Sequence, residues 1–174
     1  DACEALSAPG TNAELPDGEP VLVVGCDSML EIGGQMLGKP HTPEVARERI
    51  AAMRRTTATL WTGHSAAILA PLPSQGDARS SHGEERRIER QVTRSASTLV
   101  HFGDISDAEI EAYVATGEPL HVAGSFTVDG LGGPFIEGVT GDYHSVVGIS
   151  LPLLRSMATE LGVFWPDLWD APRP

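Results

Sequence analysis

The stretch "VLVVGCDSML", Val21 to Leu30, is the best starting point for predicting the fold. Its first six residues are apolar, rich in β-branched valine and too few for a helix, so they predict a buried strand over 21–26. Asp27 places a carboxylate at the end of this strand. Twelve residues later, in "GGQMLGKP", stands Lys39, the one lysine of a chain that has eleven arginines.

Around this strand the sequence predicts an alternation of strands and helices. Gly33-Gly34 predicts a two-residue hairpin turn between 29–32 and 35–37. Thr42-Pro43 predicts the start of a helix that runs to about residue 55, with threonine as N-cap and proline in the first turn. Further strands are expected over 57–69, 84–102, 122–128 and 135–139, further helices over 105–117 and 150–162, and a loop over 71–83. Hairpins combined with helices predict an α/β fold, with a mixed β-sheet flanked by helices.

The helix expected over 105–117 has the clearest boundary signals. Ser106 and Glu109 form a capping box, Ile105 and Ile110 a hydrophobic staple, and Gly117 a C-terminal stop. These signals fix both ends of the helix from local sequence alone.

Length and composition limit the classes of protein to consider. The 174 residues suffice for one domain, expected over 20–170, after an irregular tail over 1–19. A net charge of −12 argues against binding to nucleic acid, because such affinity comes mostly from lysine and arginine. No apolar run approaches the roughly 20 residues that cross a bilayer, which argues against membrane insertion. Two cysteines, Cys3 and Cys26, are too few for a disulfide framework and favour a cytoplasmic protein.

Several familiar motifs are excluded by their spacing. Gly33 to Lys39 matches the first seven positions of a P-loop, but Pro40 replaces the Ser or Thr that would hold magnesium. The six histidines show no metal-binding spacing, and two cysteines cannot complete a zinc site. No G-x-S-x-G sequence supplies a hydrolase nucleophile.

Asp27 and Lys39 remain the best candidates for chemistry. By position alone, Asp27 could be a turn residue at a strand end and Lys39 a solvated charge. Ligands of α/β proteins, however, gather beyond the carboxyl ends of strands. A compact ammonium also differs from the guanidinium fork that this chain uses elsewhere. The pair is therefore interpreted as a carboxylate for metal or water and a point charge for phosphate.

The segments "VVGCDSML…GQMLGKP", "LWTGH" and "ISDAEIEAYVATGEPLHVAGSFTVDGLGGPFIEGVTGDYHSVVGISLPLL" resemble the Maf (septum-formation) family of nucleoside triphosphate pyrophosphatases. The resemblance covers 21–161 and implies a fold like that of Maf and inosine triphosphatase proteins. It implies hydrolysis of non-standard or modified nucleoside triphosphates to a monophosphate and pyrophosphate with Mg²⁺ or Mn²⁺. It also implies Asp27 as the general base or metal-site carboxylate, Lys39 as a substrate contact, and a homodimer.

The family begins with a strand, a helix and an S-x-S-x-R segment that binds phosphate, and this chain starts beyond that point. A catalytically weak or inactive nucleotide-binding regulator of division or septum formation is therefore the alternative function. A third hypothesis is a remnant that folds only with a partner, because a missing strand would leave a sheet edge unpaired.

Three further residues are candidates for substrate binding. Many relatives carry glutamine where this chain has Asp129 in "AGSFTVDG", and the aspartate resembles the branch that acts on 7-methylguanosine triphosphate. A carboxylate only accepts hydrogen bonds, which suits the N–H groups of guanine, although Asp129 before Gly130 could also simply make a turn. Glu118 in "TGEPL" and Thr62 in "LWTGH" are the other two, and Thr62-Gly63 is expected to act through its backbone.

Overall fold

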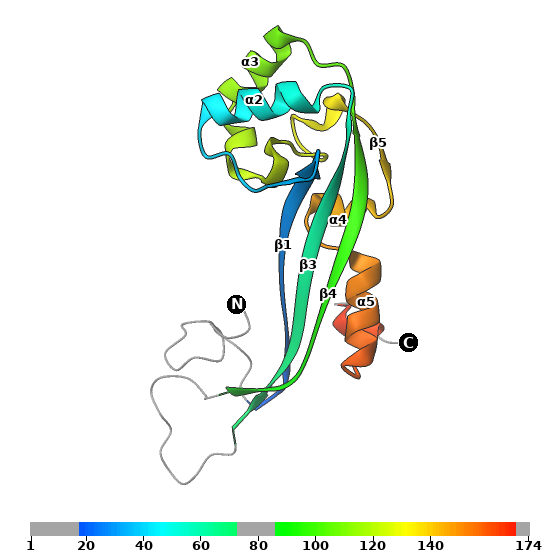
Figure 1. The fold of residues 1–174 in the computed structure, drawn as a ribbon. Coiled ribbons are helices and arrows are strands. Elements are labelled where there is room, and N and C mark those ends of the chain that lie inside the picture. The colour runs from blue at the N-terminus through cyan, green and yellow to red at the C-terminus, as the bar shows by residue number, and fades with distance from the viewer. Residues whose placement is uncertain (1–17, 73–85, 170–174) are drawn as a thin grey trace. The chain divides into compact units, whose positions relative to one another are not determined.

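A computed structural model describes residues 18–72 and 86–169 (Figure 1). Five strands form one sheet in the order β2-β1-β3-β4-β5. The strands are β1 (Val21–Ile32), β2 (Gln35–Leu37), β3 (Thr57–Pro71), β4 (Arg86–Phe102) and β5 (Ile136–Thr140). The helices are α2 (Pro43–Met53), α3 (Asp107–Ala115), α4 (Tyr143–Val147) and α5 (Leu151–Glu160), with short 3-10 helices η1 (Glu118–His121), η2 (Ala123–Ser125), η3 (Gly133–Phe135) and η4 (Trp165–Leu168). The expected α/β class is confirmed, and β1–β2 and β4–β5 pair antiparallel.

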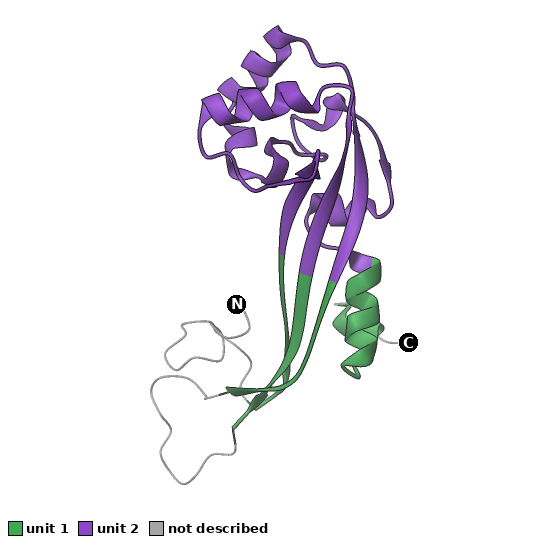
Figure 2. Ribbon diagram, in the orientation of Figure 1, with its two compact units in different colours: residues 1–26, 64–94, 152–174 green, residues 27–63, 95–151 purple. Residues whose placement is uncertain are grey.

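The described chain divides into two compact units (Figure 2). Unit 2 contains residues 27–63 and 95–151, and unit 1 contains the remaining described residues. All five residues proposed for the site from the sequence belong to unit 2. The two units are described separately below.

Unit 2 has a core in which β1, β3 and β4 contribute side chains that pack against α2 and α3. Phe102 and Phe126 meet edge to face, with ring centroids 4.9 Å apart. Such aromatic pairs add to the stabilisation from burial. The buried side chains of this core include Leu30, Ile50, Met53, Leu60, Val100, Phe102, Ile105, Ile110, Tyr113, Val114 and Phe126.

The predicted hairpin between β1 and β2 is confirmed. Leu30 pairs with Leu37 and Ile32 with Gln35. Gly33 and Gly34 have φ of +57° and +79°, the left-handed conformation that a type I′ turn requires at both central positions. Glycine reaches these angles without a steric penalty, so the turn follows directly from the sequence.

The predicted helix boundaries are also confirmed. Thr42 caps α2 through its side chain, which accepts a hydrogen bond from the Val45 N–H. Ser106 and Glu109 form the capping box of α3, and Gly117 after its end has φ of +79°. These interactions satisfy backbone groups that a helix leaves free at its ends.

The prediction of a strand over 122–128 is wrong. Residues of this segment form η2 instead, and Gly124 and Ser125 have φ of +71° and +63°, which an extended strand does not allow. A Cβ on Gly124 would lie 2.6 Å from Cδ2 of Leu30, so the backbone here packs directly on the core. The neighbouring strand, expected over 135–139, is observed as β5.

Unit 1 has its own small apolar cluster, formed by Val23, Ala67 and Leu69 with Val21 packed against them. It also contains α5, which confirms the last predicted helix. No helix among the described residues is long and apolar enough to cross a bilayer. The tail over 1–19 and the loop over 71–83 lie mostly outside the described residues.

Candidate functional site

Asp27 lies within β1 and not at its end, which corrects the position expected from the sequence. The strand continues to Ile32 because the residues after Asp27 form the hairpin with β2. The Asp27 side chain is exposed, and its Oδ1 accepts a hydrogen bond from the Ser28 N–H at 2.9 Å. The carboxylate is therefore presented from a strand backbone, which is a rigid support, and stays open to solvent.

Thr62 lies on the opposite face of the sheet from Asp27. Its side chain is buried, and its Oγ1 lies 2.8 Å from Oγ of Ser28 and donates to the Ser145 carbonyl at 3.3 Å. Since successive side chains of a strand point to opposite faces, Asp27 faces away from this network. A contact between Thr62 and substrate would have to come from the backbone, as the sequence suggested, and it stays a prediction.

Lys39 is exposed in the short connection between β2 and α2. The residues beside it are anchored. The Gly38 carbonyl accepts from Arg49 at 2.7 Å, and the His41 N–H donates to the Leu120 carbonyl at 3.3 Å. His41 also has a φ of +64°, which is uncommon for a residue with a side chain. Lys39 thus projects from a backbone that is fixed on both sides.

Asp129 is exposed in the segment 127–133, which we call the 127–133 loop. The preceding segment, with η2, is linked to the Lys39 connection because the Gly124 N–H donates to the Gly38 carbonyl at 3.4 Å. The backbone thus joins the part of the chain that carries Lys39 to the part that leads to Asp129. No hydrogen bond or ion pair joins Asp27 to Lys39 within the described residues.

Glu118 lies at the start of η1, and its carboxylate reaches the 127–133 loop. It accepts hydrogen bonds from the N–H groups of Leu131 and Gly132, each at 3.0 Å. Burial by itself would raise the pKa of Glu118, but the hydrogen bonds that it accepts outweigh burial and lower this pKa. Burial raises the pKa of Tyr113, whose hydroxyl therefore remains a donor to Glu118.

Asp142 has a local structural role at the start of α4. Its Oδ1 accepts from the backbone N–H of His144 and lies 3.0 Å from Nδ1 of the same residue. Burial opposes ionisation of Asp142, but hydrogen bonds from Ser150 and His144 prevail and lower its pKa. Its Oδ2 is buried without a hydrogen-bond partner.

Asp27 offers one exposed carboxylate to a divalent ion, and the other ligands of such an ion would have to come from water and phosphate. In the described part of the chain, no group of three or more His, Cys, Asp or Glu residues could hold a metal ion. Magnesium does not need such a group, because it keeps several waters and is usually bound by one or two carboxylates plus substrate phosphates. The exposed carboxylate of Asp27 could supply the protein ligand.

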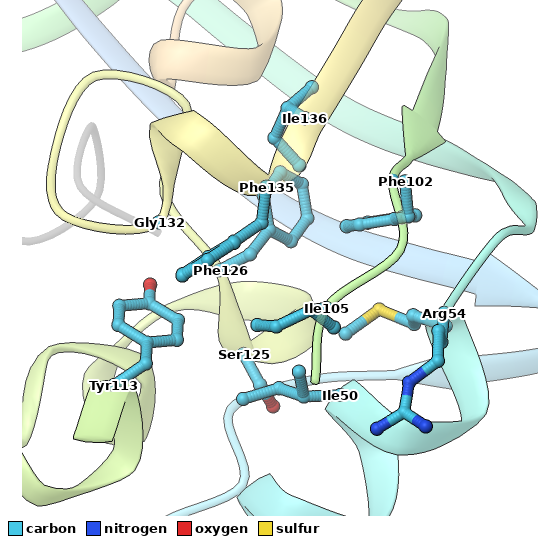
Figure 3. Close-up of a pocket in the computed structure, with 12 residues that line it drawn as sticks. Ile50, Arg54, Phe102, Ile105, Tyr113, Ser125, Phe126, Gly132, Phe135 and Ile136 are labelled. Atoms are coloured by element: carbon cyan, nitrogen blue, oxygen red, sulfur yellow. The ribbon is translucent and has the colours of Figure 1, made fainter. Parts of the chain in front are cut away.

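A small cavity lies inside unit 2, among Phe102, Phe126, Phe135 and Ile105 (Figure 3). It offers about 20 Å³ of room for the centre of a water-sized molecule. This volume corresponds to one or two waters, because one water needs roughly 10–15 Å³ by the same measure. The cavity is therefore too small to hold a nucleotide.

Sequence reasoning missed the polar network of Ser28, Thr62 and Ser145. Serine and threonine residues that meet from separate elements have no sequence signature, so no local pattern predicts their contact. It also missed the hydrogen bonds that Glu118 accepts from the backbone of the 127–133 loop. The glycines of "DGLGG" were a usable signal, because clustered glycines often mark a close approach of backbone to another group.

The family model described as Maf-like protein matches residues 3–161. Three curated relatives illustrate the similarity. A nucleoside triphosphate pyrophosphatase/Nudix hydrolase fusion protein of Bifidobacterium longum is 45% identical over 87% of this chain and 28% of its own length. Nucleoside triphosphate pyrophosphatases of Cutibacterium acnes and Rhodococcus erythropolis are 46% and 48% identical over 88% and 86% of this chain.

The chain spans 65% and 63% of the length of these last two relatives. It therefore covers less than two thirds of each of the three. The extent of the family match and the identities of 45% to 48% confirm the resemblance seen in the sequence motifs. The chain belongs to the Maf-like protein family.

Proposed function

We propose that the protein is a nucleoside triphosphate pyrophosphatase that hydrolyses non-standard or modified nucleotides to a monophosphate and pyrophosphate. The observation that carries this proposal is the name shared by relatives 45% to 48% identical to most of the chain. The exposed Asp27 and Lys39, both on well-anchored backbone, supply groups suited to this chemistry.

Asp27 is proposed as the general base. A water molecule attacks the α-phosphorus, a new P–O bond forms, and the water proton passes to the Asp27 carboxylate. The bond between the α-phosphorus and the oxygen that bridges to the β-phosphorus breaks, and pyrophosphate leaves with that oxygen. The exposure of Asp27 allows a water and a phosphate to approach it together. Its place on β1 limits the freedom of the carboxylate, which favours a productive geometry.

Lys39 is proposed to bind the phosphates. A chain of net charge −12 repels a triphosphate, so binding requires local positive charge. The ammonium of Lys39 provides one such charge on a connection that is fixed at Gly38 and His41. A divalent ion held by Asp27 would supply further positive charge to the phosphates when it is bound.

Asp129 is proposed to select the base, with a preference for guanine of the 7-methylated type. The carboxylate is exposed and forms no hydrogen bond with the described residues, so it is available to a ligand. It would accept from the N–H groups of guanine and attract the positive charge of a 7-methylated ring.

The direct test is pyrophosphate release in the presence of Mg²⁺ from 7-methyl-GTP, GTP, UTP, CTP and dTTP. Asp27→Asn should abolish release, and isothermal titration without the metal should show that it retains its affinity for substrate. Glu48→Gln, an exposed carboxylate change on α2, should behave as the unmodified protein. A folded protein that binds these nucleotides and releases no pyrophosphate would instead be a nucleotide-binding regulator.

A further inference from the structure

Glu118 is surrounded by hydrogen-bond donors from α3 and the 127–133 loop. Oε1 accepts from the Tyr113 hydroxyl at 2.9 Å, from the Gly132 N–H at 3.0 Å and from the Thr127 hydroxyl. Oε2 accepts from the Leu131 N–H at 3.0 Å. Three donors thus converge on Oε1 and one reaches Oε2, so both oxygens of the carboxylate are hydrogen-bonded within the protein.

The glycines of the loop are required by this arrangement. A Cβ on Gly130 would lie 2.6 Å from Oγ1 of Thr127 and 2.8 Å from Oε2 of Glu118. A Cβ on Gly132 would lie 2.5 Å from the Tyr113 hydroxyl, which points toward this glycine (Figure 3). The backbone thus approaches the Glu118 carboxylate and the Tyr113 hydroxyl more closely than any side chain would permit.

Asp129 lies between two residues that donate hydrogen bonds to the Glu118 carboxylate. Thr127 precedes it by two positions and Leu131 follows it by two, and both donate to Glu118. Asp129 itself is exposed, as is Gly130 beside it. The position of the Asp129 carboxylate is therefore set by the backbone on either side, and through that backbone by Glu118.

We propose that Glu118 is a positioning residue for base selection, which fixes the 127–133 loop so that Asp129 meets the nucleotide base. This inference rests on the function proposed above. It assigns Glu118 a role behind the substrate site in place of the direct substrate contact expected from the sequence. The lowered pKa of Glu118 keeps the carboxylate ionised at neutral pH, as this role requires.

Glu118→Gln tests the role with almost no change in side-chain size. The amide nitrogen of glutamine is a donor, and in either orientation it faces at least one N–H or hydroxyl group that now donates to Glu118. At least one hydrogen bond to the loop is therefore lost. Tyr113→Phe is a second variant, which removes one donor to Oε1 and leaves the carboxylate in place.

The kinetic readout is the ratio of kcat/KM for 7-methyl-GTP to kcat/KM for UTP. Glu118→Gln should lower this ratio by about tenfold, mainly through KM for 7-methyl-GTP, since the loss of one charge-assisted hydrogen bond is of this size. Glu111→Gln, an exposed carboxylate change on α3, is the matched control and should leave the ratio unchanged.

A double-mutant cycle shows whether Glu118 acts through Asp129. In an Asp129→Ala background no carboxylate remains to be positioned, so Glu118→Gln should change the ratio by less than about twofold. An unchanged ratio in Glu118→Gln alone, or an equal loss in both backgrounds, would overturn the proposal.

Hydrogen exchange separates this inference from the proposed function. The amides of Leu131 and Gly132 should exchange faster in Glu118→Gln than in the unmodified protein. In Glu111→Gln they should exchange at the same rate as in the unmodified protein. If the unmodified protein releases no pyrophosphate, the proposed function fails, and faster exchange would still show that Glu118 holds the loop. Unchanged exchange of both amides would contradict the role of Glu118 whatever the activity.

Discussion

Ser28 of β1 and Thr62 of β3 share a hydrogen bond of 2.8 Å between their hydroxyl oxygens, directly behind the exposed carboxylate of Asp27. Thr62 is fully buried and also donates to the Ser145 carbonyl. The two hydroxyls tie neighbouring strands together on the core face, while Asp27 faces solvent on the other side. The strand that presents the proposed base is therefore tied to its neighbour by side chains that point away from that base.

Thr62→Val should destabilise the protein by about 1–3 kcal/mol, because it removes the buried Thr62 hydroxyl and its hydrogen bonds to the partly buried Ser28 and to the Ser145 carbonyl. The change is nearly isosteric, so the loss reports the hydrogen bonds and not a cavity. Urea unfolding followed by circular dichroism measures it. Thr59→Val, at a partly exposed position of the same strand, should change stability by less than about 0.5 kcal/mol. Equal effects of the two changes would show that the network contributes nothing.

The parts of the fold that sequence predicted are those with local signals. The hairpin depends on the positive φ angles of Gly33 and Gly34, which two adjacent glycines adopt readily. The capping box of Ser106 and Glu109 involves only residues of the first turn of the helix. The sequence prediction ended β1 too early, because Asp27 has a low propensity for strands. Pairing of β1 with β2 and β3 outweighs this propensity and extends the strand past Asp27.

The parts that sequence did not predict depend on distant contacts. The segment with Gly124 and Ser125 reads as a strand, yet it turns because its backbone packs against Leu30. Glu118 is separated by 13 and 14 residues from the amides that it binds, Leu131 and Gly132. Neither relationship has a period or a spacing that a sequence pattern could show.

Gly132→Ala should destabilise the protein by about 1–3 kcal/mol, the usual cost of overpacking. The φ of Gly132 is −74°, which alanine adopts freely, so the cost comes only from the contact with the Tyr113 hydroxyl and the loop backbone. Thermal unfolding measures it. Gly38→Ala is the matched control, because nothing lies within 4 Å of a Cβ at that position. A Gly132→Ala protein as stable as this control would contradict the tight packing of the loop.

Lys39→Met should lower kcat/KM for every triphosphate by about ten- to a hundredfold, the value of one charge-assisted contact to phosphate. The effect should be the same for all bases, since a phosphate contact carries no base preference. Arg155→Met, an exposed change of equal charge on α5, controls for the change in net charge. A loss confined to one base would place Lys39 at the base and not at the phosphates.

Stability should fall as the pH drops below about 4.5, the ordinary pKa of a glutamate. Burial of Glu118 opposes ionisation, but its hydrogen bonds prevail and place its folded-state pKa below the unfolded value. The unfolded chain therefore takes up the proton first, and the stabilisation present above the unfolded pKa is lost as the pH falls through the folded pKa. Asp142, whose pKa is also lowered, adds to the same trend below its ordinary value of 3.8.

Urea midpoints between pH 7 and pH 3 measure this dependence. Glu118→Gln should show a shallower decline than the unmodified protein, because one of the contributing carboxylates is gone. An identical decline in both proteins would assign the acid sensitivity to Asp142 and other groups, and would remove Glu118 from the explanation.

Asp129→Gln should shift base preference from guanine-type toward uracil-type substrates. A glutamine amide both donates and accepts, so it can pair with the carbonyl groups of uracil, which a carboxylate repels. The ratio of kcat/KM for 7-methyl-GTP to that for UTP should fall by about ten- to a hundredfold, with Glu48→Gln as the unaffected control. Because Asp129 is exposed, the change should leave the urea midpoint within error of the unmodified protein. An unchanged ratio would show that Asp129 only turns the chain before Gly130.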